Sequence, residues 1–126
     1  DWQSKPADPF NAYEPVDASA AAISAQGLIR LGNYLGTRAG KRYLQAGLSV
    51  AKTLFAEPYL STKKSHQGLL LHSIYHWPNR WDHVPIGQQV ASGEASMWGD
   101  YHLLELAHLI KRMADAGEYP AFFISS

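Results

Sequence analysis

The sequence predicts an all-α fold, and three observations lead to that prediction. Three segments carry apolar residues at helical spacing, and glycine or proline follows each of them. The sequence contains no internal repeat and no low-complexity segment. The apolar faces of the three helices are wide, and such faces need more partners than three helices supply. We therefore expect a portion of a larger all-α assembly, while a free-standing three-helix domain stays the alternative.

Length and composition exclude several classes of protein. With 126 residues the chain is one domain or part of one, and 46% apolar residues suffice for a core. Eleven basic residues balance eleven acidic ones without a basic stripe, which argues against a nucleic-acid partner. The absence of cysteine excludes disulfides and thiolate metal sites. No apolar run approaches membrane-spanning length, so we expect no membrane partner.

The beginning of the chain predicts an irregular lead-in over residues 1–16. Three prolines in this segment each remove a backbone donor and push the preceding residue out of the α region. The chain opens on Asp1 and Trp2 without a methionine, and no signal peptide is visible. We therefore expect a chain that is processed, cut or a piece of something longer. Its cellular location stays undecided.

Residues 17–57 predict a helical hairpin. Its first helix runs from Ala18 to about Leu35, with Asp17 or Ser19 as N-cap. Gly36 is expected to stop it. The expected buried face of this helix consists of Ala21, Ala22, Ile23, Ala25, Leu28, Ile29 and Leu31. Many small residues make its first half narrow, as in the inner ring of a helical barrel.

The second helix of the hairpin is expected from Thr37 or Arg38 to Ala56, and Pro58 ends it. Its apolar stripe consists of Leu44, Leu48, Ala51 and Phe55, with Gly47, Val50 and Leu54 beside it. Because the connection between the two helices is short, they should pack antiparallel.

Residues 58–95 predict a long loop region, and residues 96–117 predict the third helix. Within the loop, Leu69–Tyr75 is either a short strand or an extended segment. The third helix starts at Ser96 or Gly99 and ends before Gly117. Its expected buried face consists of Leu103, Leu106, Ala107, Ile110, Met113 and Ala114. The apolar tail, residues 118–126, must pack on something.

Aromatic and small polar residues gather between Gly68 and Glu105. This stretch holds three of the four tryptophans, interspersed with serine, glycine and proline. Flat rings stack on the C–H faces of sugars, and short polar groups bind their hydroxyls. The stretch therefore suits a sugar or another polyhydroxylated ligand.

Three motifs in this order resemble glycoside hydrolase family 88, the unsaturated glucuronyl hydrolases. They are DASAAAISAQGLIRL (residues 17–31), GLLLHSIYHWPN (68–79) and GEASMWGDYHLLELA (93–107). The resemblance runs over essentially all 126 residues but covers only the C-terminal part of such an enzyme. It implies the C-terminal part of an (α/α)6 barrel, with three long helices and an aromatic-rich loop.

The resemblance also implies an activity. Family members release a 4,5-unsaturated uronic acid from lyase-generated oligosaccharides, and no cofactor is implied. A carboxylic acid protonates the C4=C5 bond, water adds at C5, and the resulting hemiketal opens. This differs from displacement at the anomeric carbon by two flanking carboxylates. The family's catalytic aspartates lie in the N-terminal half, so no residue here is assigned a catalytic role, and the chain alone is expected to be inactive.

The expected partners follow from the same resemblance. They are an unsaturated oligosaccharide substrate and the missing N-terminal half of the same barrel. Unsaturated rhamnogalacturonyl hydrolases share the fold and are the first alternative. A helical module that binds carbohydrate or protein without catalysis is the second.

One wall of the substrate pocket is expected at residues 92–98. Some family members that act on sulfated glycans carry Ser-x-x-Ser-x-Lys here, whereas this chain carries Ser92, Ala95 and Met97 at the three positions. A sulfated substrate is therefore not predicted, although Ser96 can donate one hydrogen bond. The expected substrate-binding residues are Tyr75, His76, Trp81, Ser92, Ser96 and Trp98.

Each of these candidates also has a purely structural interpretation. His72 and His76 are four apart, but Pro78 and an extended backbone would spoil a metal site, so we expect no metal. Buried hydrogen-bonded or pocket-lining histidines are the alternatives. The tryptophans serve either as stacking platforms or as anchors of the loop. For Glu94 and Asp100, helix capping is a simpler role than acid catalysis.

Overall fold

The computed structural model describes residues 8–116, and it confirms the all-α prediction. Its elements are α1 (Ala18–Ala39), α2 (Lys41–Leu54), the short 3-10 helix η2 (Trp77–Asn79) and α3 (Met97–Ala114). In this part of the chain no strand forms, and Leu60 and Leu70 make an isolated antiparallel bridge. The segment from Leu69 to Tyr75 is thus extended rather than a strand.

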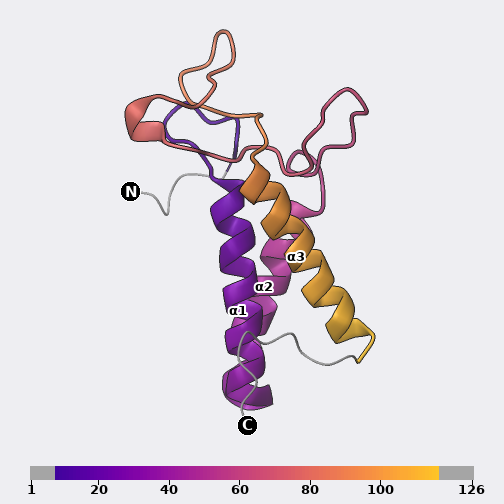
Figure 1. Cartoon of the computed structure of the whole chain (residues 1–126). Coiled ribbons are helices and arrows are strands. Elements are labelled where there is room, and N and C mark those ends of the chain that lie inside the picture. Colours follow the sequence, from indigo (N-terminus) through magenta and orange to yellow (C-terminus); the bar gives the residue numbers. More distant parts are fainter. Residues whose placement is uncertain (1–7, 117–126) are drawn as a thin grey trace.

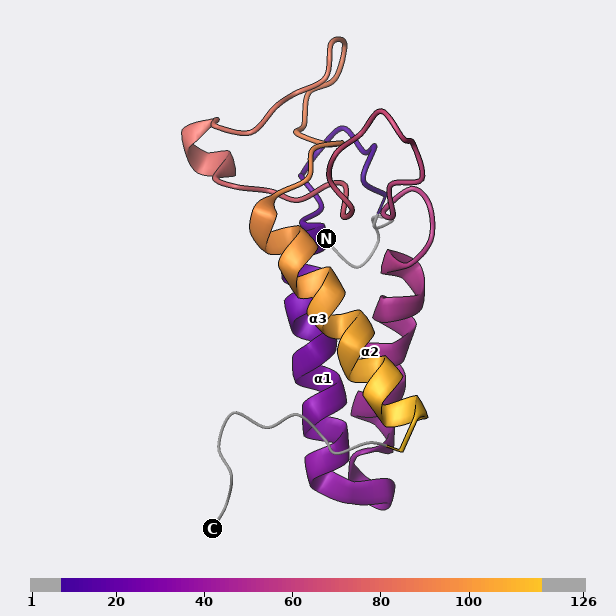
Figure 2. The same ribbon diagram turned by 45° about the vertical axis from the view of Figure 1, so that its right-hand side comes forward.

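The three long helices form a stem, and the loops gather at one end of it (Figure 1). α2 runs antiparallel to α1 as predicted, and α3 lies along α1 in the same direction as α1 (Figure 2). Consequently the first turns of α1 and α3 and the last turn of α2 all lie at the loop end of the stem (Figures 1 and 2). We call residues 58–96 the cap.

Local chemistry explains where α1 and α2 begin and end. Asp17 is the N-cap of α1, because its carboxylate accepts a hydrogen bond from the Ser19 backbone N–H at 2.9 Å. Gly36 leaves the helical conformation with φ 74°, as expected of a stop. α1 nevertheless extends across this kink to Ala39, and α2 begins at Lys41 and ends at Leu54. The predicted start of α2 at Thr37 or Arg38 is therefore wrong.

The buried face of α1 differs from the predicted one. It consists of Ala18, Ser19, Ala22, Ala25, Gln26, Ile29 and Gly32. Ile23 and Leu31, predicted to be buried, are 47% and 40% exposed. The small residues face the other two helices because they allow close contact. At Gly47 of α2, an added Cβ would lie 2.8 Å from the carbonyl oxygen of Ala25.

α3 begins at Met97, directly after Ser96, which was one of the two predicted starts and is the N-cap. The Ser96 hydroxyl accepts a hydrogen bond from the Gly99 N–H at 3.0 Å and caps the helix. The residues buried from α3 are Gly99, Leu103, Leu106 and Leu109. Leu109 was not in the predicted face, whereas Ala114, which was, is exposed. The expected cap at Gly117 and the packing of the tail lie outside the described residues.

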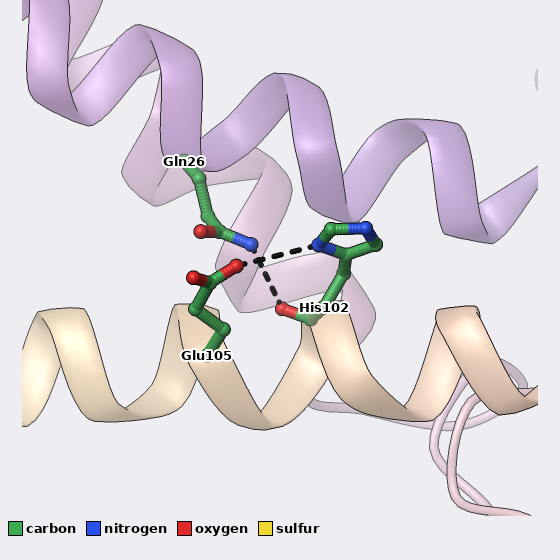
Figure 3. Close-up of polar contacts among 3 residues, drawn as sticks. All are labelled: Gln26, His102 and Glu105. Atoms are coloured by element: carbon green, nitrogen blue, oxygen red, sulfur yellow. Dashed lines mark hydrogen bonds and ion pairs between the residues drawn. The ribbon is translucent and has the colours of Figure 1, made fainter. Parts of the chain in front are cut away.

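A polar contact fixes the register of α1 against α3 (Figure 3). The buried Gln26 amide donates a hydrogen bond to the backbone carbonyl of His102 at 3.1 Å. His102 Nδ1 lies 3.3 Å from a carboxylate oxygen of Glu105 on the same helix. Because a buried amide is costly to leave without a partner, sliding α3 along α1 would be penalised.

Apolar side chains remain exposed on the outer faces of the stem. Ile23, Leu31 and Tyr34 are exposed on α1, and Tyr101 and Leu104 are exposed on α3. Their spacing of three or eight residues places each group along one side of its helix. Among the described residues, no helix is long and apolar enough to cross a membrane.

Candidate functional site

Two aspartates hold the cap to the stem, and a third, Asp82, holds the cap together. Asp17, beyond capping α1, accepts hydrogen bonds from the Ser19 hydroxyl at 2.6 Å and from the Ile74 N–H at 3.2 Å. Asp100, in the first turn of α3, accepts from the N–H groups of Leu69 and Leu70 at 2.9 and 2.8 Å. Both carboxylates therefore satisfy backbone donors of the segment at residues 69–74.

Asp82 likewise accepts hydrogen bonds from backbone donors, in the next part of the cap. Its two carboxylate oxygens accept from the backbone N–H groups of Tyr75 and His76, the latter at 2.9 Å.

Capping was the simpler role predicted for Asp100 and Glu94, and it is wrong for both. Ser96 caps α3, Asp100 binds another segment, and the exposed Glu94 side chain makes no hydrogen bond or ion pair within residues 8–116.

The Trp98-Gly99-Asp100 triplet joins α3 to α1 and to the segment at residues 69–74. The indole N–H of Trp98 donates to the Ser19 hydroxyl at 3.2 Å, across to α1. At Gly99 an added Cβ would lie 2.4 Å from the Ser73 hydroxyl, so only glycine permits this approach. With Asp100 on Leu69 and Leu70, the triplet gathers residues from all three of the motifs recognised in the sequence.

His72 is a buried structural residue at the centre of the cap. Its backbone has φ 64°, an uncommon conformation for a residue with a side chain, and its carbonyl accepts from the Ala18 N–H at 3.0 Å. Its Nδ1 accepts from the Gly93 N–H at 3.1 Å, so the proton of the neutral ring is on Nε2. Phe10 and Tyr59 pack edge-on against the ring.

Burial lowers the pKa of His72, and this effect outweighs the hydrogen bond to the Pro58 backbone and the charge of Asp8, which raise it. His72 is thus the buried, hydrogen-bonded histidine that was one of the predicted alternatives. His76 is exposed and caps η2, with its Nδ1 accepting from the Asn79 N–H at 3.3 Å. Within residues 8–116, no group of three or more histidine, aspartate or glutamate side chains could hold a metal ion.

Four rings form a continuous aromatic row across the cap. Tyr75 lies between Trp98, at 5.4 Å between ring centroids, and Trp81, at 5.5 Å with planes only 27° apart. His76 continues the row beyond Trp81 at 5.2 Å. Tyr75 and Trp81 are each 61% exposed, so the row presents ring surface to solvent. Asp82 holds the backbone of the row at Tyr75, and Ser19 accepts a hydrogen bond from Trp98 at the other end of the row.

Beside this row lies an open hollow of about 520 Å³, which we call the aromatic hollow. That volume is within the range of small-molecule sites. Of the predicted binding residues, Tyr75, Trp81, Ser96 and Trp98 line the hollow. Ser92 is 4% exposed and does not line it, and His76 contacts the back of Trp81.

Two further residues of the hollow bear on its chemistry. His83 lines it, and sequence reasoning missed this residue because nothing in the loop distinguishes it from other histidines. Glu94 lines it as well, and its carboxylate has no partner among residues 8–116, whereas the Asp82 carboxylate accepts hydrogen bonds from backbone donors. The hollow thus combines stacking surfaces with hydroxyl, imidazole and carboxylate groups, which are the groups that bind polyhydroxylated ligands.

α1 and α3 run parallel, α2 packs antiparallel on α1, and the loops lie at the N-terminal ends of α1 and α3. This arrangement is a glycoside-hydrolase-like helical fold, as the comparison with solved structures shows. The chain matches a crystal structure of an unsaturated glucuronyl hydrolase specific for heparin, with a TM-score of 0.61 and 27% sequence identity. The match covers 81% of this chain and 24% of the other, so the chain spans about a quarter of that protein's length. No protein-family model matches the sequence, and no curated protein matches it.

Proposed function

We propose that this chain is part of a glycoside hydrolase that removes 4,5-unsaturated uronic acid from oligosaccharides made by polysaccharide lyases. The observation that carries the proposal is the aromatic row beside the aromatic hollow, in a fold like that of an unsaturated glucuronyl hydrolase. All three sequence motifs contribute residues to the walls or supports of that hollow.

The row would supply binding rather than proton transfer. Tyr75 and Trp81 offer flat faces on which the C–H side of a sugar ring can stack. Ser96, His83 and Glu94 offer hydrogen bonds to its hydroxyls from the same hollow. Asp17, Asp82 and Asp100 accept hydrogen bonds from backbone N–H groups. The family that the chain resembles has its catalytic aspartates in the N-terminal half, so the acid that protonates the C4=C5 bond is expected outside this chain.

We further propose that additional helices of the same barrel pack on the exposed sides of the stem. The apolar residues along α1 and α3 support this, because soluble helices rarely leave such stripes uncovered. Ile23 and Leu104 are examples from the two helices. If the chain is expressed alone, it should bind a dye that reports exposed apolar surface, and a chain that includes the remaining helices should not.

The activity itself has a direct test. Protein expressed from the complete reading frame should abolish the absorbance of the unsaturated uronate in lyase-generated disaccharides. Inertness towards chondroitin, hyaluronan and heparin disaccharides alike would contradict the glucuronyl assignment. Activity on unsaturated rhamnogalacturonan fragments would establish the first alternative. Sugar binding without loss of absorbance, in a reading frame that lacks further helices, would establish the non-catalytic module.

A further inference from the structure

The Ser19 hydroxyl lies in the middle of a chain of hydrogen bonds that joins the start of α1 to the aromatic row. It donates to the Asp17 carboxylate at 2.6 Å, and it accepts from the indole N–H of Trp98 at 3.2 Å. The direction of this chain is fixed, because an indole only donates, an ionised carboxylate only accepts, and a hydroxyl has a single proton. The Ser19 proton therefore points to Asp17, and the oxygen lone pairs remain for the indole.

Asp17 gives this chain a fixed end. The oxygen that accepts the Ser19 proton, Oδ1, also accepts from the backbone N–H groups of Ser19 at 2.9 Å and Ile74 at 3.2 Å. A separation of 2.6 Å is typical of a hydroxyl that donates to a charged oxygen. Ser19 is only 3% exposed, so water has little access to its hydroxyl. The hydroxyl is therefore already oriented in the absence of a ligand.

Packing alone does not select one orientation of the Trp98 ring. The half-buried ring lines the aromatic hollow, and it also lines a second hollow of about 370 Å³ beside the start of α1. Ile23 and Ile74 line this second hollow together with Ser19. A core side chain has close contacts on all sides, whereas Trp98 adjoins open space at both hollows. The hydrogen bond from the indole N–H is thus the directional contact that orients the ring.

The orientation of Trp98 affects the exposed part of the row. The ring centroids of Trp98 and Tyr75 are 5.4 Å apart with planes at 40°, and Tyr75 in turn stacks on Trp81. The energy of such aromatic pairs depends on the distance and angle between the rings. A rotation of the indole would therefore change the wall of the aromatic hollow and the support of Tyr75 together.

We infer that Ser19 is a positioning residue of the aromatic row: its hydroxyl, oriented by Asp17, holds the Trp98 indole in the orientation in which that ring lines the aromatic hollow. Ser19 does not line this hollow itself, so it acts on a ligand there through Trp98. The inference rests on the proposed function for its effect on sugar binding, whereas its effect on the indole can be measured without a ligand.

Substitutions in protein from the complete reading frame test this role. Ser19→Ala removes the hydroxyl but keeps the backbone N–H that donates to Asp17. The indole N–H of Trp98, identified in NMR spectra by its absence in Trp98→Phe, should exchange with solvent roughly tenfold faster in Ser19→Ala. The KM for the unsaturated disaccharide should rise roughly fivefold at an unchanged kcat, because a binding surface is disturbed and no proton-transfer group is touched.

Two matched variants separate the hydroxyl from the rest of the side chain. Ser19→Thr keeps the hydroxyl and should keep the wild-type indole exchange and KM, since the hollow beside Ser19 has room for the added methyl group. Ser24→Ala makes the same change at an exposed serine of α1 and should alter neither quantity. In a Trp98→Phe background, Ser19→Ala should leave the KM unchanged, because residues that act as a unit are not additive.

Wild-type indole exchange in Ser19→Ala would overturn the inference, and so would equal rises in KM for the alanine and threonine variants. An undiminished effect of Ser19→Ala in the Trp98→Phe background would overturn it as well, because Ser19 would then act independently of the indole. If no unsaturated disaccharide binds or reacts, the proposed function fails, whereas faster indole exchange in Ser19→Ala would still support the positioning of the ring.

Discussion

The stem and the cap of this protein are held by different kinds of interaction. In the stem, fully buried apolar side chains such as Ile29, Leu106 and Leu109 pack between the helices. The backbone N–H groups of the cap donate hydrogen bonds to Asp17, Asp82 and Asp100. The stem thus depends on buried area spread over many residues, whereas the cap adds these hydrogen bonds to a few buried apolar side chains such as Leu70 and Val90.

This difference predicts two separable kinds of damage. Loss of a core side chain should lower the free energy of unfolding of the whole structure, because the helices share one core. Loss of a single carboxylate in the cap should free its loop while the helices remain folded, since loops can open locally at less than the global free energy. Tyr75, His76 and Trp81 of the aromatic row lie in the cap, so the loss of one carboxylate there should disturb the row while the helices remain folded.

The largest effect on stability is expected from Leu106→Ala in the stem. Leu106 is fully buried in the core cluster, and its truncation leaves a cavity. We expect a loss of about 3 kcal/mol in the free energy of unfolding, measured by urea denaturation followed by circular dichroism. In the chain expressed alone, Leu104→Ala, on the exposed side of the same helix, is the control and should cost less than about 0.5 kcal/mol. Equal losses for the two leucines would contradict the packing of α3 against α1.

Asp100→Ala should cost less in total but act on the cap. It leaves the Leu69 and Leu70 N–H groups without an acceptor, and Leu70 is fully buried. We expect a loss of about 2 kcal/mol in local stability, seen as faster hydrogen exchange of these two amides while amides of α1 keep their protection. Asp115→Ala removes only an exposed pair with Lys111 and should leave the exchange of both regions unchanged. Uniformly faster exchange along the chain would show that stem and cap are one cooperative unit.

The stem could be predicted from sequence because its signals are local and periodic. Helical spacing located three helices, and Asp17 and Ser96 were recognised as caps or helix starts. The faces were predicted less well, since spacing alone does not say which side of a helix meets a partner. Ile23 was expected inside because it is large and apolar, but α1 turns its small residues towards α2 and α3.

The cap could not be predicted in the same way, because its order comes from contacts between residues far apart in sequence. Asp100 binds an amide 31 positions away, and Trp98 binds Ser19 at a separation of 79. The sequence motifs contained these residues but did not show that they bind one another. Composition did locate the aromatic row, since tyrosine and tryptophan concentrate in one loop, although His83 was missed and Ser92 proved to be buried.

A pH change should sharpen the comparison by acting on His72, the buried histidine of the cap. Burial lowers the pKa of His72, so the unfolded chain takes up this proton at a higher pH than the folded chain does. The contribution of neutral His72 to stability is complete above its unfolded pKa of about 6.5 and is lost as the pH falls below that value. Protonation of Nδ1 would also break the hydrogen bond from the Gly93 N–H.

Urea denaturation and hydrogen exchange at pH 7.5 and pH 5.5 measure this effect. The wild type should lose more stability over that interval than His72→Gln does, and exchange of the Gly93 amide should rise before exchange in the stem. His108→Gln, at an exposed histidine of α3, should keep the wild-type pH dependence. If His72→Gln loses as much stability as the wild type between these two pH values, His72 is not the source of the pH dependence.

The smallest effect on stability, and a large one on binding, is expected from Trp81→Ala. Trp81 is 61% exposed and contacts Tyr75 and His76 from the solvent side of the row. Because little of its surface leaves water on folding, the free energy of unfolding should change by less than about 0.5 kcal/mol. Affinity for the unsaturated disaccharide should fall roughly tenfold, because the sugar loses a stacking surface. Tyr34→Ala removes an even more exposed ring from the stem and should leave affinity unchanged. Weakened binding in both variants would show that exposed aromatic surface in general, rather than the row in the cap, holds the sugar.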